Sequence, residues 1–192
     1  MNKNTLKSDQ TKQALRDAFI RLYEQKDIRS ISIRDITELA GYNRGTFYLY
    51  YLDIYDLFEQ IKSELLSQLA RMAEEILSGA EGITRGGMTT LLLRFYSRNE
   101  KYVVPLMERD AAMLGSIIDV LRPVFFSRLG DLSHEERREV EYLLQYHFAA
   151  VINVINYWVR SGKDISREEM AGIVYEAAAK GVLTVFQDKR VF

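Results

Sequence analysis

Residues 31–58 read ISIRDITELAGYNRGTFYLYYLDIYDLF, and the fold can be worked out from this stretch. Ser32, followed three residues later by Asp35, has the pattern of a helix capping box, so a short helix is predicted to begin there. Gly41 is predicted to end it, because glycine tolerates the left-handed backbone of a tight turn. Asn43 stands where it would cap a second short helix. Two short helices joined by a glycine turn are typical of a helix-turn-helix.

The second short helix, predicted over residues 44–50, is narrow enough to lie in the major groove of DNA, which is about 12 Å wide. The apolar residues expected to hold the two helices together are Ile36, Leu39 and Phe47. The side chains left to project outward are Arg44, Thr46, Tyr48 and Tyr50. An exposed arginine alone is usually ordinary surface, and either tyrosine alone could belong to the core. The ordered set at fixed spacing therefore carries the prediction of DNA binding.

Helical periodicity continues on both sides of this stretch. A first helix is predicted from about residue 8 to residue 25. Asp53 and Asp56 are predicted to cap a long helix that reaches about Leu77. Residues 78–87 are glycine-rich and are predicted to form a loop.

The rest of the chain shows the same helical pattern. Further helices are predicted over residues 88–98, 99–109, 111–129, 135–160 and 167–186. Pro123 is expected to kink or divide the third of these, because proline breaks the helical hydrogen-bond ladder. Ser133 with Glu136, and Ser166 with Glu169, have the capping-box pattern at the start of the last two. The prediction is an all-α protein of about nine helices.

Composition and charge fit a small DNA-binding module attached to a larger body. The 192 residues are 47% hydrophobic and have a net charge of −1. Residues 1–50 hold nine Lys and Arg against six Asp and Glu, so this head is mildly basic and the remainder acidic. We expect a helix-turn-helix DNA-binding domain over residues 1–52 and a helical regulatory and dimerisation domain over residues 53–192.

Several classes of protein are not expected from this sequence. Cysteine is absent and there are only two histidines, so neither disulfides nor a metal site is expected, and no cofactor is implied. No motif of a nucleophile elbow or a phosphate-binding glycine loop is present, so an enzyme is not expected. With no signal peptide and no apolar run of about 20 residues, we expect a cytoplasmic protein that does not enter the membrane.

The stretch quoted above resembles the DNA-binding signature of the tetracycline-repressor (TetR) family. That signature combines a capped helix, an Ala-Gly turn, a Gly-Thr-aromatic-Tyr recognition helix and a following helix with an acidic cap. The resemblance runs without a gap over about residues 11–61. It implies an all-α, dimeric protein with an N-terminal DNA-binding domain and a C-terminal ligand-binding and dimerisation domain.

The resemblance also implies roles for individual residues in binding a double-stranded DNA operator. Arg34 would reach a base edge, and Arg44 would read a guanine through its O6 and N7 atoms. Gly45 would let the backbone approach DNA closely. The residues implied to contact phosphate, sugar or base are Tyr42, Asn43, Thr46, Tyr48 and Tyr50. Ile54 departs from the family pattern, which commonly has a phosphate-binding Lys there.

The C-terminal region yields two further sets of candidates. Residues 135–160 and 167–186 are predicted to form half of a four-helix dimer interface, with an intramolecular core as the alternative. The interface residues would be Ala149, Asn153, Asn156, Ile173, Ala177 and Gly181. A ligand pocket would be lined by Tyr96, Tyr102, Met107, Met113, Phe125, Phe126, Tyr146 and His147, although ordinary core is the alternative for this set too.

We therefore expect a dimeric repressor that binds a palindromic operator and is released by an unknown small-molecule effector. The C-terminal region is also similar to TetR-like regulators of the dihydroxyacetone-kinase group, some of which act as coactivators. The alternative function is accordingly a TetR-like coactivator that works mainly through protein–protein contacts. Ile54 is the feature that favours this alternative.

Overall fold

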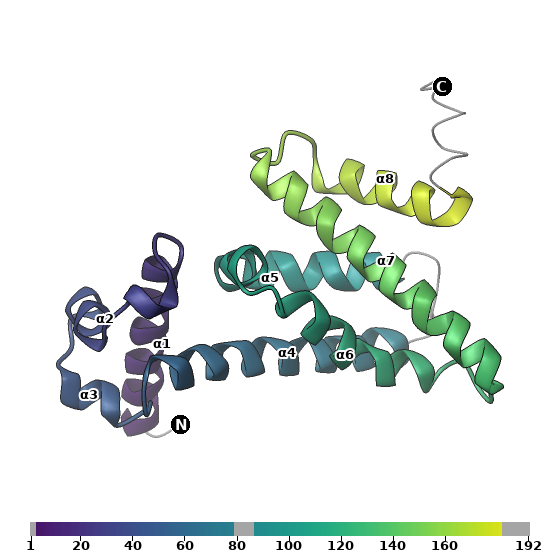
Figure 1. Cartoon of the computed structure of the whole chain (residues 1–192). Helices are drawn as coiled ribbons and strands as arrows, with labels where there is room; N and C mark the ends of the chain where they lie inside the picture. Colours follow the sequence, from purple (N-terminus) through teal and green to yellow (C-terminus); the bar gives the residue numbers. More distant parts are fainter. Residues whose placement is uncertain (1–2, 79–86, 182–192) are drawn as a thin grey trace. The chain divides into compact units, whose positions relative to one another are not determined.

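The computed structural model describes residues 3–78 and 87–181. This part of the chain is helical and contains no strand, which confirms the all-α class. Its elements are α1 (Lys3–Tyr23), the 3-10 helix η1 (Ile28–Ser30), α2 (Ile33–Ala40), α3 (Arg44–Tyr48), α4 (Ile54–Ser78), α5 (Gly87–Arg109), α6 (Met113–Phe126), α7 (His134–Arg160) and α8 (Arg167–Lys180) (Figure 1). Among these described helices, none has an apolar stretch long enough to cross a membrane.

The chain divides into two compact units. The N-terminal unit consists of Met1–Leu65 and Lys101–Arg109, and the C-terminal unit of Leu66–Glu100 and Asp110–Phe192. Helices α4 and α5 thus each contribute to both units. Asn99 has a non-helical backbone (φ −123°, ψ 15°) that interrupts α5 close to where the chain changes unit. This break confirms the prediction that two helices meet near residue 98.

The N-terminal unit is organised around the buried faces of its helices. Phe19, Ile36 and Phe47, from α1, α2 and α3, are fully buried. Leu39 was predicted to join them, but 48% of its surface is exposed, so this prediction is wrong. The buried residues of α2 are Ile36 and Thr37, and the next position on that face of the helix is Ala40. Leu39 lies to one side of this face.

In the C-terminal unit, α7 packs against both α6 and α8 (Figure 1). The predicted capping box at Ser133 and Glu136 is confirmed. At the start of α8, the Ser166 hydroxyl accepts from the Glu169 N–H at 3.1 Å, which is one of the two bonds predicted there. Helix α6 continues past Pro123 and ends at Phe126, so of the two predicted effects, a kink or a division, the division does not occur.

Two predictions extend beyond the described residues. The glycine-rich loop was predicted over residues 78–87; Ser78 ends α4 and Gly87 begins α5, and residues 79–86 lie outside the described chain. The last helix was predicted to reach residue 186, and the described part of α8 ends at Lys180.

Candidate nucleic-acid interface

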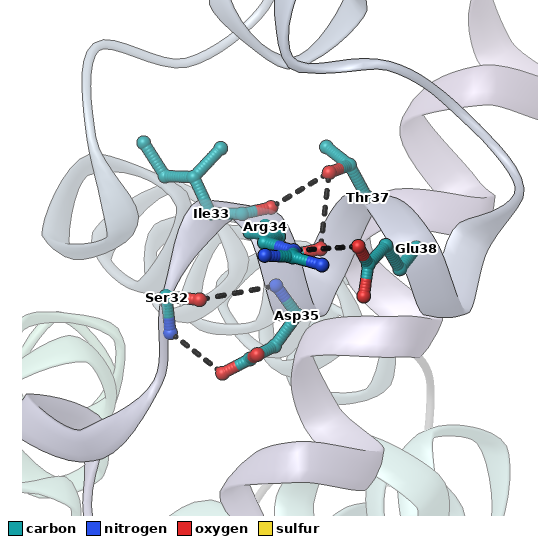
Figure 2. Close-up of polar contacts among 6 residues, drawn as sticks. All are labelled: Ser32, Ile33, Arg34, Asp35, Thr37 and Glu38. Atoms are coloured by element: carbon teal, nitrogen blue, oxygen red, sulfur yellow. Dashed lines mark hydrogen bonds and ion pairs between the residues drawn. The ribbon is translucent and has the colours of Figure 1, made fainter.

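Helix α2 is fixed at both ends by the residues that the sequence singled out. The Ser32 hydroxyl accepts from the Asp35 N–H at 3.1 Å, and the Asp35 carboxylate accepts from the Ser32 N–H at 3.1 Å (Figure 2). Gly41 adopts the predicted left-handed conformation, with a φ of 76°. Its N–H and that of Tyr42 bond to the last carbonyls of α2, so the turn leads directly into the next helix.

A lysine from the preceding loop reinforces this cap. Lys26 Nζ lies 2.8 Å from Asp35 Oδ2. The hydrogen bond to Lys26, followed by that from the Ser32 N–H, lowers the pKa of Asp35 from 3.8 to about 2. The carboxylate is thus held in the charged form that both bonds need.

This pKa shift predicts a pH dependence of stability. The folded-state pKa lies below the unfolded value, so the contribution of Asp35 is present above about pH 4 and is lost as the pH falls towards 2. We expect Asp35→Asn to lower the melting temperature at pH 7, and we expect the two proteins to converge near pH 2. A constant difference in melting temperature across this range would show that the charge of Asp35 does not stabilise the cap.

Arg34, predicted to reach a base edge, lies on the exposed side of α2. Its Nε donates to Glu38 Oε1 at 2.6 Å, one helical turn further along (Figure 2). Because this ion pair is exposed, it contributes little to stability. Arg34 would have to exchange Glu38 for DNA in order to contact a base.

Helix α3 begins at the predicted cap but is shorter than predicted, ending at Tyr48 instead of Tyr50. Asn43 Oδ1 accepts from the Thr46 N–H at 2.9 Å and from the Thr46 hydroxyl at 3.2 Å. One turn later the Phe47 ring is fully buried. The short helix is therefore held by its N-terminal cap on one side and by an aromatic anchor on the other.

The side chains predicted to contact DNA differ in their exposure to solvent and in their partners. Arg44 is exposed, and its guanidinium makes no ion pair or hydrogen bond within the described residues. Tyr48 is 59% exposed. Thr46 and Tyr50 are half-buried, and Tyr42 and Asn43 are exposed. The structure thus brings the residues of the turn and of α3 together, with Arg44 as their free cation.

Gly45 is crowded by the side chain that caps α3. A Cβ built on Gly45 would lie 3.2 Å from Asn43 Oδ1, which is closer than ordinary van der Waals contact. The absence of a side chain at position 45 therefore has a structural reason within the domain.

An apolar surface that was not predicted from the sequence follows α3. Leu49 is 76% exposed and Leu52 is 82% exposed, and Tyr55 is exposed as well. The predicted cap of α4 is formed beside them: the Asp56 N–H donates to Asp53 Oδ1, and the Leu52 N–H donates to Asp56 Oδ2, both at 2.8 Å. The backbone is therefore well fixed where these side chains project.

The residues predicted to line a ligand pocket do not share one unit. Tyr102 and Met107 belong to the N-terminal unit, and the others to the C-terminal unit. The Tyr102 hydroxyl donates to the Asp17 carboxylate of α1, whose Oδ1 also lies 2.7 Å from Lys101 Nζ. Burial and the neighbouring carboxylate raise the pKa of the Tyr102 phenol. In the C-terminal unit, the Tyr96 hydroxyl donates to Asn156 Oδ1, and Met113 is buried.

A small apolar cavity between α7 and α8 combines residues from both C-terminal predictions. It encloses about 130 Å³ and is lined by Tyr146, His147, Ala150, Val151, Val154, Ile173, Val174, Ala177 and Ala178. Burial lowers the pKa of His147. Of the other residues predicted at the dimer interface, Asn153 and Gly181 are exposed and Ala149 is half-buried. Phe125 and Phe126, also predicted for the pocket, are half-buried on α6 and do not line this cavity.

Comparison with known proteins finds a similarity in the N-terminal region. The family model of the bacterial regulatory proteins, tetR family, matches residues 15–61, which include α2, α3 and the start of α4. No curated protein matches the sequence.

Solved structures resemble the chain over most of its length. The fatty acid degradation regulator FadR from Bacillus halodurans is 16% identical, with a TM-score of 0.62 over 90% of this chain and 96% of that one. A TetR transcriptional regulator from Streptococcus agalactiae 2603V is 20% identical, with a TM-score of 0.60 over 91% and 97%. At these identities the likeness concerns the fold. Residues 15–61 are therefore similar to the tetR family of bacterial regulatory proteins, and the described chain has the all-helical fold of these two solved regulators.

Proposed function

We propose that the protein is a homodimeric transcriptional repressor that acts in the cytoplasm, binds a palindromic operator and leaves it when a small molecule binds. The observation that carries the proposal is the presentation of Arg44 at the start of α3. Asn43 caps this helix, Phe47 anchors it in the core, and the Arg44 guanidinium has no partner within the described residues. A free guanidinium on a short, fixed helix is suited to bidentate recognition of guanine in the major groove.

The surrounding residues would fix the register of the protein on DNA. Tyr48 offers an exposed phenol, and Tyr42 lies on the exposed turn before the helix. Asn43 uses its carbonyl oxygen for the cap, so its amide NH₂ group is left to donate to a phosphate. Contacts of this kind position a protein on the duplex, whereas base contacts specify the sequence.

Exposed apolar side chains on α7 and α8 support the homodimer. Those on α7 are Tyr142, Leu143, Tyr146 and Tyr157, and those on α8 are Ile173 and Tyr175. Exposed apolar side chains in this number suit an interface between subunits, and in a two-fold dimer the same surface meets itself. Asn156 accepts a bond from Tyr96 within the same unit, so we place it outside the proposed interface.

An effector site is proposed near Tyr146 and His147. The cavity that these residues line is about 130 Å³, whereas sites for drug-sized ligands are about 300–1,000 Å³. An effector bound there would have to be small or would have to move α7 and α8 apart. Either event would connect the site to the proposed dimer interface, which involves the same two helices.

The proposal is tested by measuring oligomeric state and DNA binding on the same preparation. We expect sedimentation to give a dimer, and we expect this dimer to bind the DNA upstream of its own gene in preference to a scrambled duplex. A strict monomer, or equal affinity for both duplexes at moderate salt, would refute the proposal.

Leu49, Leu52 and Tyr55 favour a second candidate, a coactivator that contacts another protein. These exposed apolar side chains follow α3, where the sequence also has Ile54 in place of the family's common Lys. In this case, replacing Leu49 and Leu52 with serine would abolish regulation in cells, while Arg44→Ala would not. The repressor proposal expects the opposite ranking.

The variant Gly45→Ala tests whether position 45 is a glycine because of the nearby Asn43 side chain or because the backbone approaches DNA closely. Its stability reports on the first reason and its DNA affinity on the second. Alanine is favoured over glycine within a helix by about 1 kcal/mol, whereas disturbing an N-cap costs about 0.5–2 kcal/mol. Because these effects oppose one another, we expect the unfolding free energy to change by less than about 1 kcal/mol. If the backbone at Gly45 approaches DNA closely, the affinity should still fall clearly in an anisotropy titration. Unchanged affinity would leave the crowding of Asn43 as the only reason for the glycine.

A further inference from the structure

The first half of α1 lies beside the recognition helix α3 and contacts the residues on either side of it (Figure 1). Thr11 Oγ1 is 3.5 Å from the Tyr42 hydroxyl, just before α3. Lys12 Nζ lies over the Tyr50 ring, 5.6 Å from its centroid, just after α3. Two consecutive residues of α1 thus meet the two tyrosines that flank the helix proposed to enter the groove.

Like Arg44, Lys12 has no acidic partner in the part of the chain that the structure describes. Within the described residues its ammonium makes no ion pair, and the contact that it does make is with the Tyr50 ring. Other cations of the N-terminal unit are paired with carboxylates: Arg16 with Glu64, Lys26 with Asp35, Arg29 with Asp27 and Arg34 with Glu38. Because the aromatic ring carries no net charge, an ammonium held against it keeps its full positive charge and can still bind an anion.

From this geometry we propose that Lys12 binds a phosphate of the DNA backbone and that the Tyr50 ring positions its ammonium for this contact. The proposal rests on DNA binding by α3, and it extends the binding surface to a second helix, α1. It also gives Tyr50 a different role from direct phosphate binding, because this side chain is half-buried and its ring supports the lysine. Thr11, one residue earlier on α1, adds a hydroxyl on the same side of the unit.

The salt dependence of DNA binding measures this contact directly. Each neutralised phosphate adds about 0.9 to the slope of log affinity against log salt. Because the proposed dimer carries two copies of Lys12, we expect Lys12→Gln to reduce the slope by about 1.8. Between about 50 and 200 mM salt the wild-type affinity should then fall about twelvefold more than that of the variant. Lys12→Arg should keep the wild-type slope because it keeps the charge.

Substitutions at Arg29 and Tyr50 complete the set of variants for this salt-dependence experiment. Arg29→Gln removes one positive charge beyond the other end of α1, where Arg29 is paired with Asp27, and it should leave the slope unchanged. Tyr50→Leu removes the supporting ring, whereas Tyr50→Phe retains it. Lys12→Gln should therefore change the slope by much less when it is combined with Tyr50→Leu than in the wild type, and by the full amount when it is combined with Tyr50→Phe. Thermal unfolding verifies that each variant is folded.

The outcomes distinguish this inference from the proposed function. If the wild type shows no selective DNA binding, the proposed function fails. If the wild type binds selectively but Lys12→Gln has the wild-type slope, DNA binding stands and the role of Lys12 is refuted. If Lys12→Gln and Arg29→Gln reduce the slope equally, the effect is one of overall charge, which also refutes a specific contact.

Discussion

Phe47→Ala is expected to lower the unfolding free energy of the N-terminal unit by about 3–5 kcal/mol, the usual range for truncating a fully buried phenylalanine. The Phe47 ring is fully buried and lies 5.4 Å from the Tyr51 ring, measured between centroids. Because α3 has only five residues, it cannot be stable on its own and depends on this anchor. Denaturant unfolding of the full chain, followed by circular dichroism, gives the measurement.

Tyr48→Ala is the matched control for this prediction. Tyr48 is the next residue in the same helix and its side chain is mostly exposed, so its truncation should change stability by less than about 0.5 kcal/mol. If Phe47→Ala were as mild as Tyr48→Ala, α3 would not be held by the core in the way described.

Arg44→Ala is expected to weaken selective DNA binding by about 1–3 kcal/mol, or roughly 5- to 150-fold, for each bidentate base contact that is lost, and a dimer on two half-sites loses two of them. The Arg44 guanidinium has no partner within the described residues, so its removal should leave the fold intact. The loss should be larger for the operator than for a scrambled duplex, because a phosphate contact would weaken both equally.

Anisotropy titrations of both duplexes at one salt concentration measure the difference. Arg29→Ala serves as the control, since it removes an arginine that is paired with Asp27 outside α3. Equal losses for the operator and the scrambled duplex would assign Arg44 to the phosphate backbone. No loss on either duplex would remove it from the interface.

Local signals in the sequence were sufficient for the helix-turn-helix. The capping residues Ser32, Asp35 and Asn43, and the turn at Gly41, depend on hydrogen bonds within a few residues, and the structure contains all of them. The break in α5 near Asn99 was also predicted correctly from the chain. These features need no information about distant parts of the molecule.

Features that depend on tertiary packing were not predictable in the same way. Periodicity placed Leu39 with the core, but an eight-residue helix can be rotated by a fraction of a turn without changing its pattern. Composition grouped Tyr102 with the ligand-pocket candidates, whereas its hydroxyl bonds to Asp17, 85 residues away. The exposure of Leu49 and Leu52 could not be predicted either, because the local sequence does not indicate whether an apolar side chain is exposed to solvent.

The central claim, that α3 enters the major groove through Arg44, is tested most directly by methylation protection of guanine N7 in the upstream DNA. N7 lies in the major groove, where arginine reads guanine. The account predicts protected guanines in two half-sites about one helical turn apart, with the same guanine in each half-site losing protection in Arg44→Ala. Bound protein that protects no guanine N7, or identical protection by wild type and Arg44→Ala, would contradict it.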